Sequence, residues 1–313
     1  MPVSVVVLNW NGAHLLPHCL DAVLAQEPAP QVWVVDNASV DGSAQLVRSS
    51  YPDVRLREPG ANLGFAGGNN VALREVTTDY VALLNNDAVP EPGWLSGLVA
   101  VLDARPDVAA VTPKVLMHPS GLVNSAGGWV DRLGHGRDRG FGLADTGRWD
   151  VAAEVFYAPA TACLYRTAAV RDVGLLDEDF FLYYEDVDLS WRLRLAGWSV
   201  RYEPTCVVRH QHSASAGSGS PVHLFHDARN RLLTVVKDAP AGPALAACLR
   251  LPVTAAGFAV RGEPARGLVL ARAWLSFLAL LPRMLLRRRA LTRHAVVRRS
   301  ELERVRAQLE RDR

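Results

Sequence analysis

The stretch Leu83-Leu84-Asn85-Asn86-Asp87 is the end of an apolar strand that is followed at once by a polar triplet. In an open α/β sheet, ligands bind beyond the carboxyl ends of the strands, so two amides and one carboxylate there favour a site for a metal-bound nucleotide. The same residues also favour a turn before Pro90, because Asn and Asp side chains hydrogen-bond their own backbone. The triplet alone fits both interpretations, and the rest of the chain decides between them.

Strand patterns and helix patterns alternate over the first hundred residues. The strand patterns are apolar and rich in β-branched residues, as is typical of strands buried on both faces of a parallel sheet. The predicted elements are strands at 3–8, 32–35, 54–56 and 80–84 and helices at 13–25, after Gly64 and at 91–102. This alternation predicts an α/β fold with a mostly parallel central sheet, right-handed crossovers and helices on both faces.

Polar residues follow the predicted strands at their carboxyl ends, which meet at one edge of a parallel sheet. Turn formation does not easily explain this repetition, so we expect a shared site. The residues expected to converge there are Asn9, Asn11, Asp36, Asn37, Asn85 and Asp87.

Asp36 has a more specific expected role, and His210 is expected to lie near it. Asp36 can accept hydrogen bonds from a ribose hydroxyl or a base imide. His210 follows a strand pattern at 200–202 and a predicted turn at Pro204, which returns it toward the same edge. An isolated histidine also fits a surface position or a hydrogen-bonded core position, so its pattern leaves both interpretations open.

Two glycine-rich segments predict two different surfaces. Residues 62–70 form a glycine-rich loop that opens a helix, and its backbone N–H groups are predicted to face an anion. The segment matches neither a P-loop nor the G-x-G-x-x-G pattern, which disfavours a dinucleotide dehydrogenase. Residues 121–147 predict loops and short strands that form a lid or an acceptor surface.

Residues 176–192 contain the densest mixture of acidic and aromatic side chains in the chain. A helix that starts near Tyr184 places Glu185, Asp186 and Asp188 in its first turn, where the helix dipole stabilises acids. Helix capping accounts for one or two of these acids but leaves the surrounding aromatic residues unexplained. A partly desolvated carboxylate at this position is suited to act as a general base.

Basic residues gather at the C-terminal end of the chain. Residues 261–313 hold 14 arginines and five acidic residues, whereas the whole chain has a net charge of +2. The apolar run over 268–286 is interrupted by Arg272 and Arg283, so it is poorly suited to span a membrane. It instead predicts an interfacial helix, whose arginines are attracted by anionic lipid headgroups. Packing of an amphipathic helix on the body of the protein is the alternative. Nucleic-acid binding is disfavoured, because aromatic platforms and known basic motifs are missing.

The composition is that of a globular protein, with 313 residues of which 49% are hydrophobic. The four cysteines lie far apart without a C-x-x-C pair, which argues against structural zinc and a disulfide framework and favours a reducing compartment. The start of the sequence shows no basic stretch or cleavage site of a secretory signal. We therefore expect a cytoplasmic protein at the inner face of the plasma membrane.

Five motifs follow one another along the chain. They are Val5-Val6-Val7-Leu8-Asn9-Trp10-Asn11-Gly12, Val34-Val35-Asp36-Asn37-Ala38-Ser39-Val40-Asp41-Gly42-Ser43, residues 62–70, Leu84-Asn85-Asn86-Asp87 and Phe181-Leu182-Tyr183-Tyr184-Glu185-Asp186-Val187-Asp188-Leu189-Ser190-Trp191-Arg192. Together and in this order, they resemble the family 2 glycosyltransferases, especially the rhamnosyltransferase-like branch. The resemblance covers about residues 3–235 and leaves the basic tail outside it.

The resemblance implies a GT-A fold and an inverting transfer of a sugar from a nucleotide diphosphate, with Mg²⁺ or Mn²⁺ bound at a D-x-D motif. That motif is Asn85-Asn86-Asp87 here, so an amide replaces the first acid and Asp87 is the main protein ligand. His210 is implied as a second metal ligand and Asp186 as the base. Glu185 or Asp188 is implied to orient the acceptor or the base. The implied donor-binding residues are Asn9, Asn11, Asp36, Asn37, Asn62, Gly67, Asn69, Asn85 and Asn86.

We expect a GT-A catalytic domain over residues 1–240 and a helical, basic, membrane-associated region over 241–313. The expected reaction moves a hexose to a hydroxyl of a glycan or polyprenol-linked glycan, in cell-envelope or exopolysaccharide synthesis. The expected donor is dTDP-L-rhamnose, with UDP-linked hexoses left open.

Three other classes of protein remain as alternatives, of which a membrane-scaffold protein needs only the C-terminal tail. A sugar nucleotidyltransferase should carry a basic residue in a glycine-rich loop after the first strand, and none lies between Asn9 and Gly12. A nucleotide-sugar-binding module without catalysis needs Asp36 and Asp87 but not Asp186.

Overall fold

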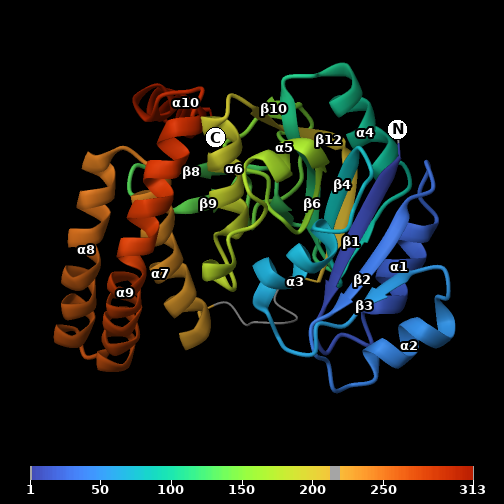
Figure 1. Cartoon of the computed structure of the whole chain (residues 1–313), viewed down its shortest axis with the longest axis horizontal. Helices are drawn as coiled ribbons and strands as arrows, with labels where there is room; N and C mark the ends of the chain where they lie inside the picture. The colour runs from blue at the N-terminus through green and yellow to red at the C-terminus, as the bar shows by residue number, and fades with distance from the viewer. Residues whose placement is uncertain (1, 212–218, 313) are drawn as a thin grey trace.

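The computed structural model describes residues 2–211 and 219–312, which form a central sheet with helices on both faces and a helical C-terminal region (Figure 1). The strands are β1 (Val3–Asn9), β2 (Gln31–Asp36), β3 (Arg55–Arg57), β4 (Tyr80–Asn85), β5 (Ala88–Pro90), β6 (Val108–Met117), β7 (Val123–Ser125), β8 (Gly128–Val130), β9 (Gly136–Asp138), β10 (Ala153–Glu154), β11 (Ala162–Arg166) and β12 (Ser199–His210). The helices are α1 (Leu16–Leu24), α2 (Ser43–Ser50), α3 (Gly64–Leu73), α4 (Trp94–Ala104), α5 (Thr167–Asp172), the 3-10 helix η1 (Glu178–Phe180), α6 (Glu185–Leu195), α7 (Pro221–Asp238), α8 (Ala241–Val260), α9 (Pro264–His294) and α10 (Arg299–Arg311).

The central sheet has the strand order β10-β12-β6-β11-β4-β1-β2-β3, with β5 paired to β12 and β7 paired to β6. β1 is parallel to β2 and β4, and β2 is parallel to β3, which confirms the predicted parallel sheet. β6 and β12 are also parallel, whereas β11 is antiparallel to both β4 and β6. In this register Asn9 pairs with Asp36 and Leu8 pairs with Asn85. The carboxyl ends of β1, β2 and β4 therefore meet at one edge.

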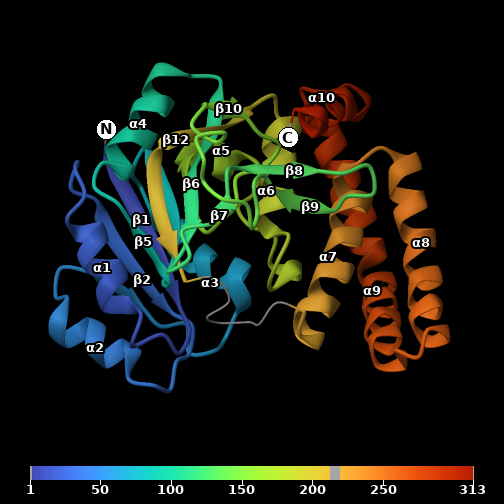
Figure 2. The same cartoon turned by 180° about the vertical axis from the view of Figure 1, so that it is seen from behind.

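Helices cover both faces of the sheet, because successive side chains of a strand point to opposite faces. Val5 and Val7 of β1 pack in a cluster with α1, α2 and α4, whereas Val6 packs with residues of α3, α5 and α6. A third cluster joins α6 to the C-terminal helices, through Trp191 of α6 and Phe277 of α9. In the view from behind, α7, α9 and α8 lie side by side (Figure 2).

Two features of the sheet differ from the sequence pattern. β6 is a ten-residue, almost wholly buried strand in a region where no strand is predicted. Its alanines and Pro113 obscure the β-branched pattern that marks the other strands. Pro204 does not end a strand, and β12 continues through it to His210. The register shifts between Glu203 and Val207, so the proline lies where the hydrogen-bond ladder is interrupted.

The C-terminal region packs on the body of the protein. α9 lies along α7, and α10 contacts β8 and α6. Arg306 of α10 donates a hydrogen bond to the carbonyl of Val130 at 2.8 Å, and the N–H groups of Val296 and Val297 donate to the carbonyl of Leu195 at 2.9 and 3.0 Å. The predicted interfacial helix over 268–286 is α9, and by length and composition both α8 and α9 are apolar enough to cross a membrane.

Candidate active site

Asp87 and His210 meet at the edge formed by the strand ends. Asp87 directly precedes β5, and Ala88 of β5 pairs with His210 at the end of β12. This pairing places Nε2 of His210 3.0 Å from Oδ1 of Asp87, with both side chains buried. Nδ1 of the same ring is 2.6 Å from Oδ1 of Asn124 on β7. Because an amide oxygen only accepts, Nδ1 carries a proton and Nε2 is directed to the carboxylate.

The Asp87–His210 pair fits a divalent cation. A carboxylate oxygen and a ring nitrogen 3.0 Å apart need a proton or a cation between them. The separation suits two neighbouring ligands of one octahedral ion, whose bonds are about 2.1 Å long. In residues 2–211 and 219–312, no donor other than His210 approaches Oδ1 of Asp87. The pair offers two ligands, and Mg²⁺ commonly completes its shell with substrate phosphates and water.

Buried amides join the ends of the three parallel strands. Nδ2 of Asn9 donates to Oδ1 of Asp36 at 3.0 Å, and Oδ1 of Asn9 accepts from Nδ2 of Asn86 at 2.7 Å. Oδ2 of Asp36 accepts from the N–H of Ser39 at 3.1 Å. A Cβ atom at Gly12 would lie 2.2 Å from Nδ2 of Asn86, so this close packing requires glycine. Asn9 therefore links the ends of β1, β2 and β4.

The start of α3 does not present free N–H groups to an anion. The N–H of Phe65 donates to the carbonyl of Phe181 at 2.5 Å, and the N–H of Gly64 donates to Oδ1 of Asn62 at 2.9 Å. A Cβ atom at Gly64 would lie 2.3 Å from the carbonyl oxygen of Phe181. The prediction of an anion-binding helix start is wrong for these two groups, because both are already bonded within the protein.

Four of the predicted donor-binding residues are buried or bonded within the protein. Nδ2 of Asn37 donates to Oδ1 of Asn62 at 2.9 Å, and Nδ2 of Asn69 donates to the carbonyl of Phe65 at 2.9 Å. Gly67 is buried in α3. These contacts shape the loop next to the strand ends, and direct binding of a donor by these residues stays a prediction.

Asn11 and Asn85 are partly exposed at the same edge. Oδ1 of Asn11 accepts from the N–H of Val40 at 2.8 Å, which ties together the loops after β1 and β2. The N–H of Asn85 donates to the carbonyl of Thr161 at 2.9 Å. The end of β4 is thereby fixed to the segment that leads into β11.

Asp186 lies in the first turn of α6, as predicted, and contacts that same segment. Its Oδ2 accepts from the N–H of Ala160 at 3.1 Å, one residue before Thr161. Burial raises the pKa of Asp186. Burial also raises the pKa of Glu185 far above its ordinary value, and the charge of Asp186 adds to this shift. Carboxyls with raised pKa values next to a binding edge are suited to proton transfer.

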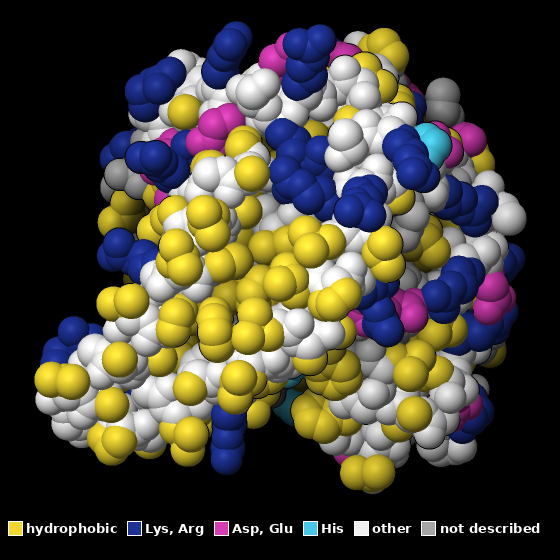
Figure 3. All heavy atoms as spheres, turned by 60° about the vertical axis from the view of Figure 1, so that its left-hand side comes forward, with side chains coloured by type: hydrophobic (Ala, Val, Ile, Leu, Met, Phe, Trp, Pro, Cys, Tyr) yellow, Lys and Arg dark blue, Asp and Glu magenta, His cyan; other side chains and the backbone are white. Residues whose placement is uncertain are grey.

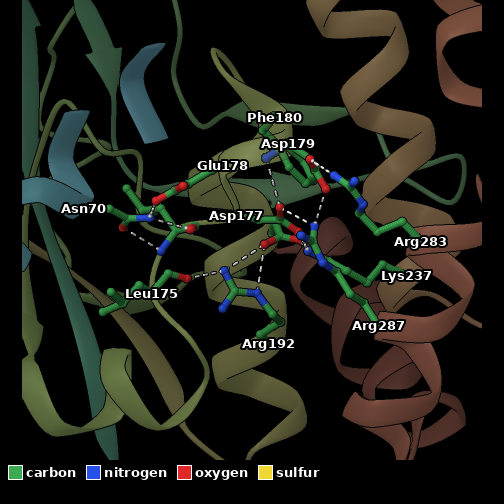
Figure 4. Close-up of polar contacts among 12 residues, drawn as sticks. Asn70, Leu175, Asp177, Glu178, Asp179, Phe180, Arg192, Lys237, Arg283 and Arg287 are labelled. Carbon is green, nitrogen blue, oxygen red and sulfur yellow. Dashed lines mark hydrogen bonds and ion pairs between the residues drawn. The ribbon is translucent and has the colours of Figure 1, made fainter. Parts of the chain in front are cut away.

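Asp188 has a different environment from Asp186. It is fully buried, pairs with Arg192 at 2.8 Å and forms a second ion pair with Lys237 of α7. Lys237 and Arg287 of α9 each pair with Asp177 at 2.5 Å, as Figure 4 shows. Breaking a buried pair by removing one partner typically costs about 3–5 kcal/mol. This environment does not fit the orienting role predicted for Asp188, and we assign it to the support of α6.

The segment that enters α6 has an unusual backbone. Phe181, Tyr183 and Tyr184 have φ angles of 65°, 68° and 73°. Left-handed conformations of residues other than glycine cost about 1–3 kcal/mol each and persist only where the surroundings impose them. Nδ2 of the buried Asn230 in α7 lies 2.8–2.9 Å from three carbonyl oxygens of this segment. α7 therefore fixes the backbone that carries Glu185 and Asp186.

Asn124 and the neighbouring contact between Ser125 and Asp138 were not predicted from the sequence. Asn124 on β7 holds the ring of His210, and the neighbouring Ser125 donates its hydroxyl to Oδ1 of Asp138 at 3.0 Å. Burial raises the pKa of Asp138 to about 7, with an upward contribution from Asp186 and a downward one from His210. The predicted acceptor surface over residues 121–147 was the only signal that pointed to this region.

Two family models match the chain. The model for glycosyl transferase family 2 matches residues 4–128, and that for glycosyl transferase family group 2 matches residues 80–231. The chain is 29% identical over 245 residues to an N-acetylglucosaminyl-diphospho-decaprenol L-rhamnosyltransferase of Mycobacterium tuberculosis, covering 71% of this chain and 80% of that protein. It is 33% identical over 221 residues to a pre-mycofactocin glycosyltransferase of the same species, covering 66% of this chain and 45% of that protein.

Solved structures with a similar fold are glycosyltransferases. A mannosyltransferase from Pyrobaculum calidifontis, in complex with GDP-Man and Mn²⁺, superposes with a TM-score of 0.56 at 20% identity, covering 88% of this chain and 86% of that one. Staphylococcus aureus TarS, in complex with UDP-GlcNAc, superposes with a TM-score of 0.59 at 18% identity, covering 91% and 83%. The fold is therefore of the GT-A type. The chain belongs to the family 2 glycosyltransferases and is similar to their rhamnosyltransferase-like branch.

Proposed function

We propose that this enzyme transfers L-rhamnose from dTDP-L-rhamnose, with inversion, to a hydroxyl of a polyprenol-linked glycan in cell-envelope or exopolysaccharide synthesis. The observation that carries the proposal is the buried Asp87–His210 pair at the strand edge, with Asp186 bonded to the segment that holds the end of β4. The donor and the acceptor are supported by the activity of the rhamnosyltransferase relative that is 29% identical.

The residues at and beside the strand edge have separate roles in the proposed reaction. Asp186 takes the proton of the acceptor hydroxyl while that oxygen attacks the anomeric carbon from the face opposite the leaving nucleotide, which inverts the configuration. Asp36 accepts hydrogen bonds from the nucleoside. Asp87 and His210 would hold Mg²⁺ or Mn²⁺, which would supply positive charge against the leaving diphosphate. The Mn²⁺ complex of a similar fold supports a divalent cation.

Binding of the donor gives the first test of this proposal. A ligand that binds only the native state raises its melting temperature, so dTDP-L-rhamnose should raise that temperature and raise it further with Mn²⁺ than with EDTA. The measurement is a thermal-shift series with dTDP-, UDP- and GDP-linked sugars. A larger shift with a UDP- or GDP-linked sugar would replace the proposed donor, and equal shifts in Mn²⁺ and EDTA would contradict the metal site.

The C-terminal helices present an apolar surface that fits a membrane. Figure 3 shows hydrophobic side chains gathered over these helices, with arginine or lysine side chains around them. Most of the exposed residues recur at intervals of three, four or seven, which places them along one face of each helix. They are Leu245, Leu249, Val253 and Val260 on α8 and Leu268, Leu275, Leu278, Leu285 and Leu286 on α9. We infer that this face enters the inner leaflet of the plasma membrane, where anionic headgroups attract the arginines.

The apolar surface lies wholly on the C-terminal helices, which supports a division of the chain into two regions. We propose residues 1–240 as the catalytic domain and 241–313 as the membrane-associated region, with α9 and α10 packed on the former through α7 and α6. A polyprenol-linked acceptor lies in the same membrane, so attachment brings the enzyme to its acceptor.

Polar substitutions on the apolar face should weaken membrane binding. Changing Leu249, Val253 and Leu275 together to serine should lower the affinity for vesicles with anionic lipid about 10³-fold or more, because each buried aliphatic side chain contributes roughly 1.5–3 kcal/mol. Vesicle sedimentation measures the affinity, and high salt should weaken the wild type as well. Val151→Ser is the control, since this exposed residue lies outside the helices. Unchanged binding by the triple variant would refute the membrane surface.

A further inference from the structure

Asp138 lies between the two parts of the candidate active site without belonging to either. It ends β9 and is partly exposed. Its Oδ1 accepts from the hydroxyl of Ser125 at 3.0 Å and is 3.4 Å from the hydroxyl of Tyr157. No lysine or arginine in residues 2–211 and 219–312 forms an ion pair with it. Although the residue is partly exposed, burial of its carboxyl group raises its pKa, and a carboxylate that is withdrawn from water only to hold the fold together usually has such a partner.

Adjacent residues connect Asp138 to both parts of the site. On β7, Ser125 bonds Asp138, and the preceding residue Asn124 bonds the ring of His210. Tyr157 lies three residues before Ala160, whose N–H holds Asp186. The charges of Asp186 and His210 both act on Asp138, which agrees with its position between them. An acceptor hydroxyl that reacts with the donor must lie beside Asp186, which has to reach its proton, and Asp138 is near enough to Asp186 for their charges to interact.

The two oxygens of Asp138 differ in their surroundings. Oδ1 is fixed by the two hydroxyl groups, whereas Oδ2 has no hydrogen-bond partner among the described residues. A carboxylate with one fixed oxygen and one open oxygen is well suited to bind a sugar hydroxyl. An ionised carboxyl accepts from the hydroxyl, and a protonated one donates to it, so either form can bind.

We propose that Asp138 binds the acceptor, through a hydrogen bond between Oδ2 and a sugar hydroxyl next to the hydroxyl that reacts. The proposal rests on the proposed function and names the part of the same site that recognises the acceptor. It assigns the β8–β9 hairpin to acceptor recognition, whereas the strand ends of β1, β2 and β4 face the donor.

The test compares two acceptors, water and a synthetic short-chain polyprenyl-diphospho-N-acetylglucosamine, with dTDP-L-rhamnose and Mn²⁺. Asp138→Ala should raise KM for the lipid-linked acceptor about 10-fold to 100-fold, which is the usual range for a lost hydrogen bond to a charged group. Asp138→Asn should raise it less, since an amide still bonds a hydroxyl. Hydrolysis of the donor by water should stay within about twofold of the wild type in both variants.

Asp131→Asn is the matched control, because Asp131 lies on the same hairpin and pairs with His135 instead. It should leave KM for the acceptor unchanged. An unchanged KM in the Asp138 variants would overturn the proposal, as would an equal loss of donor hydrolysis and transfer. Melting temperatures identify a misfolded alanine variant, in which case the asparagine variant decides. Failure of the proposed function appears separately, as absent donor hydrolysis by the wild type.

Discussion

Replacing Asp186 by asparagine should lower kcat by about 10² to 10⁴ and leave the dissociation constant of the donor almost unchanged. The amide keeps the shape of the side chain but cannot take a proton. Burial raises the pKa of Asp186, so its ionised, basic form increases as the pH rises and kcat should rise with it. Single-turnover rates and donor binding by calorimetry, measured on the same preparation, separate the chemical step from binding.

A purely structural role for Asp186 gives a different result. Asparagine caps a helix about as well as aspartate, so the change should then cost about 1 kcal/mol of stability or less and leave kcat near normal. That outcome would move the role of the base to Glu185, whose pKa is also raised by burial. Asp188→Asn should instead lower the melting temperature, because it removes a charge that Lys237 and Arg192 share.

Replacing Asp87 by alanine should reduce transfer about 10³-fold or more, since Lewis-acid stabilisation of a leaving group is worth several kcal/mol. His210 lies 3.0 Å from Asp87, so His210→Ala should weaken the same function. Asn85→Ala should have a smaller effect. Mn²⁺ binding in the presence of dTDP, followed by calorimetry, provides a readout that does not depend on turnover.

Loss of activity in Asp87→Ala should not result from unfolding. Asp87 follows β4 and its side chain supports no described contact except that with His210, so alanine should leave the melting temperature within a few degrees of the wild type. Full metal-dependent turnover in Asp87→Ala would show that the cation binds elsewhere.

The strand edge could be predicted from the sequence because its signals are local. Strands β1, β2 and β4 are short apolar runs that end in Asn or Asp, and their parallel register brings these ends together, as the contacts of Asn9 with Asp36 and Asn86 show. The start of α6 near Tyr184 was predictable for the same reason, since three acids in one turn mark a helix N-terminus.

The rest of the site depends on contacts between distant segments, which carry no local pattern. Asn124 and His210 are 86 residues apart, and Lys237 and Asp177 are 60 residues apart. Asp138 lies in a glycine-rich region whose sequence specifies turns but not which strands they join. The anion-binding prediction was wrong for the N–H groups of Gly64 and Phe65, because the sequence does not show that Asn62 and the carbonyl of Phe181 already bond them.

The anomeric configuration of the product is the most direct test of a single inverting displacement assisted by Asp186. Purified enzyme, dTDP-L-rhamnose, Mn²⁺ and a short-chain polyprenyl-diphospho-N-acetylglucosamine should yield one glycoside, whose one-bond carbon–hydrogen coupling at the anomeric centre is measured by NMR. We predict the configuration opposite to that of the donor. A product with the donor's configuration would contradict the role of Asp186 as the base of a single displacement.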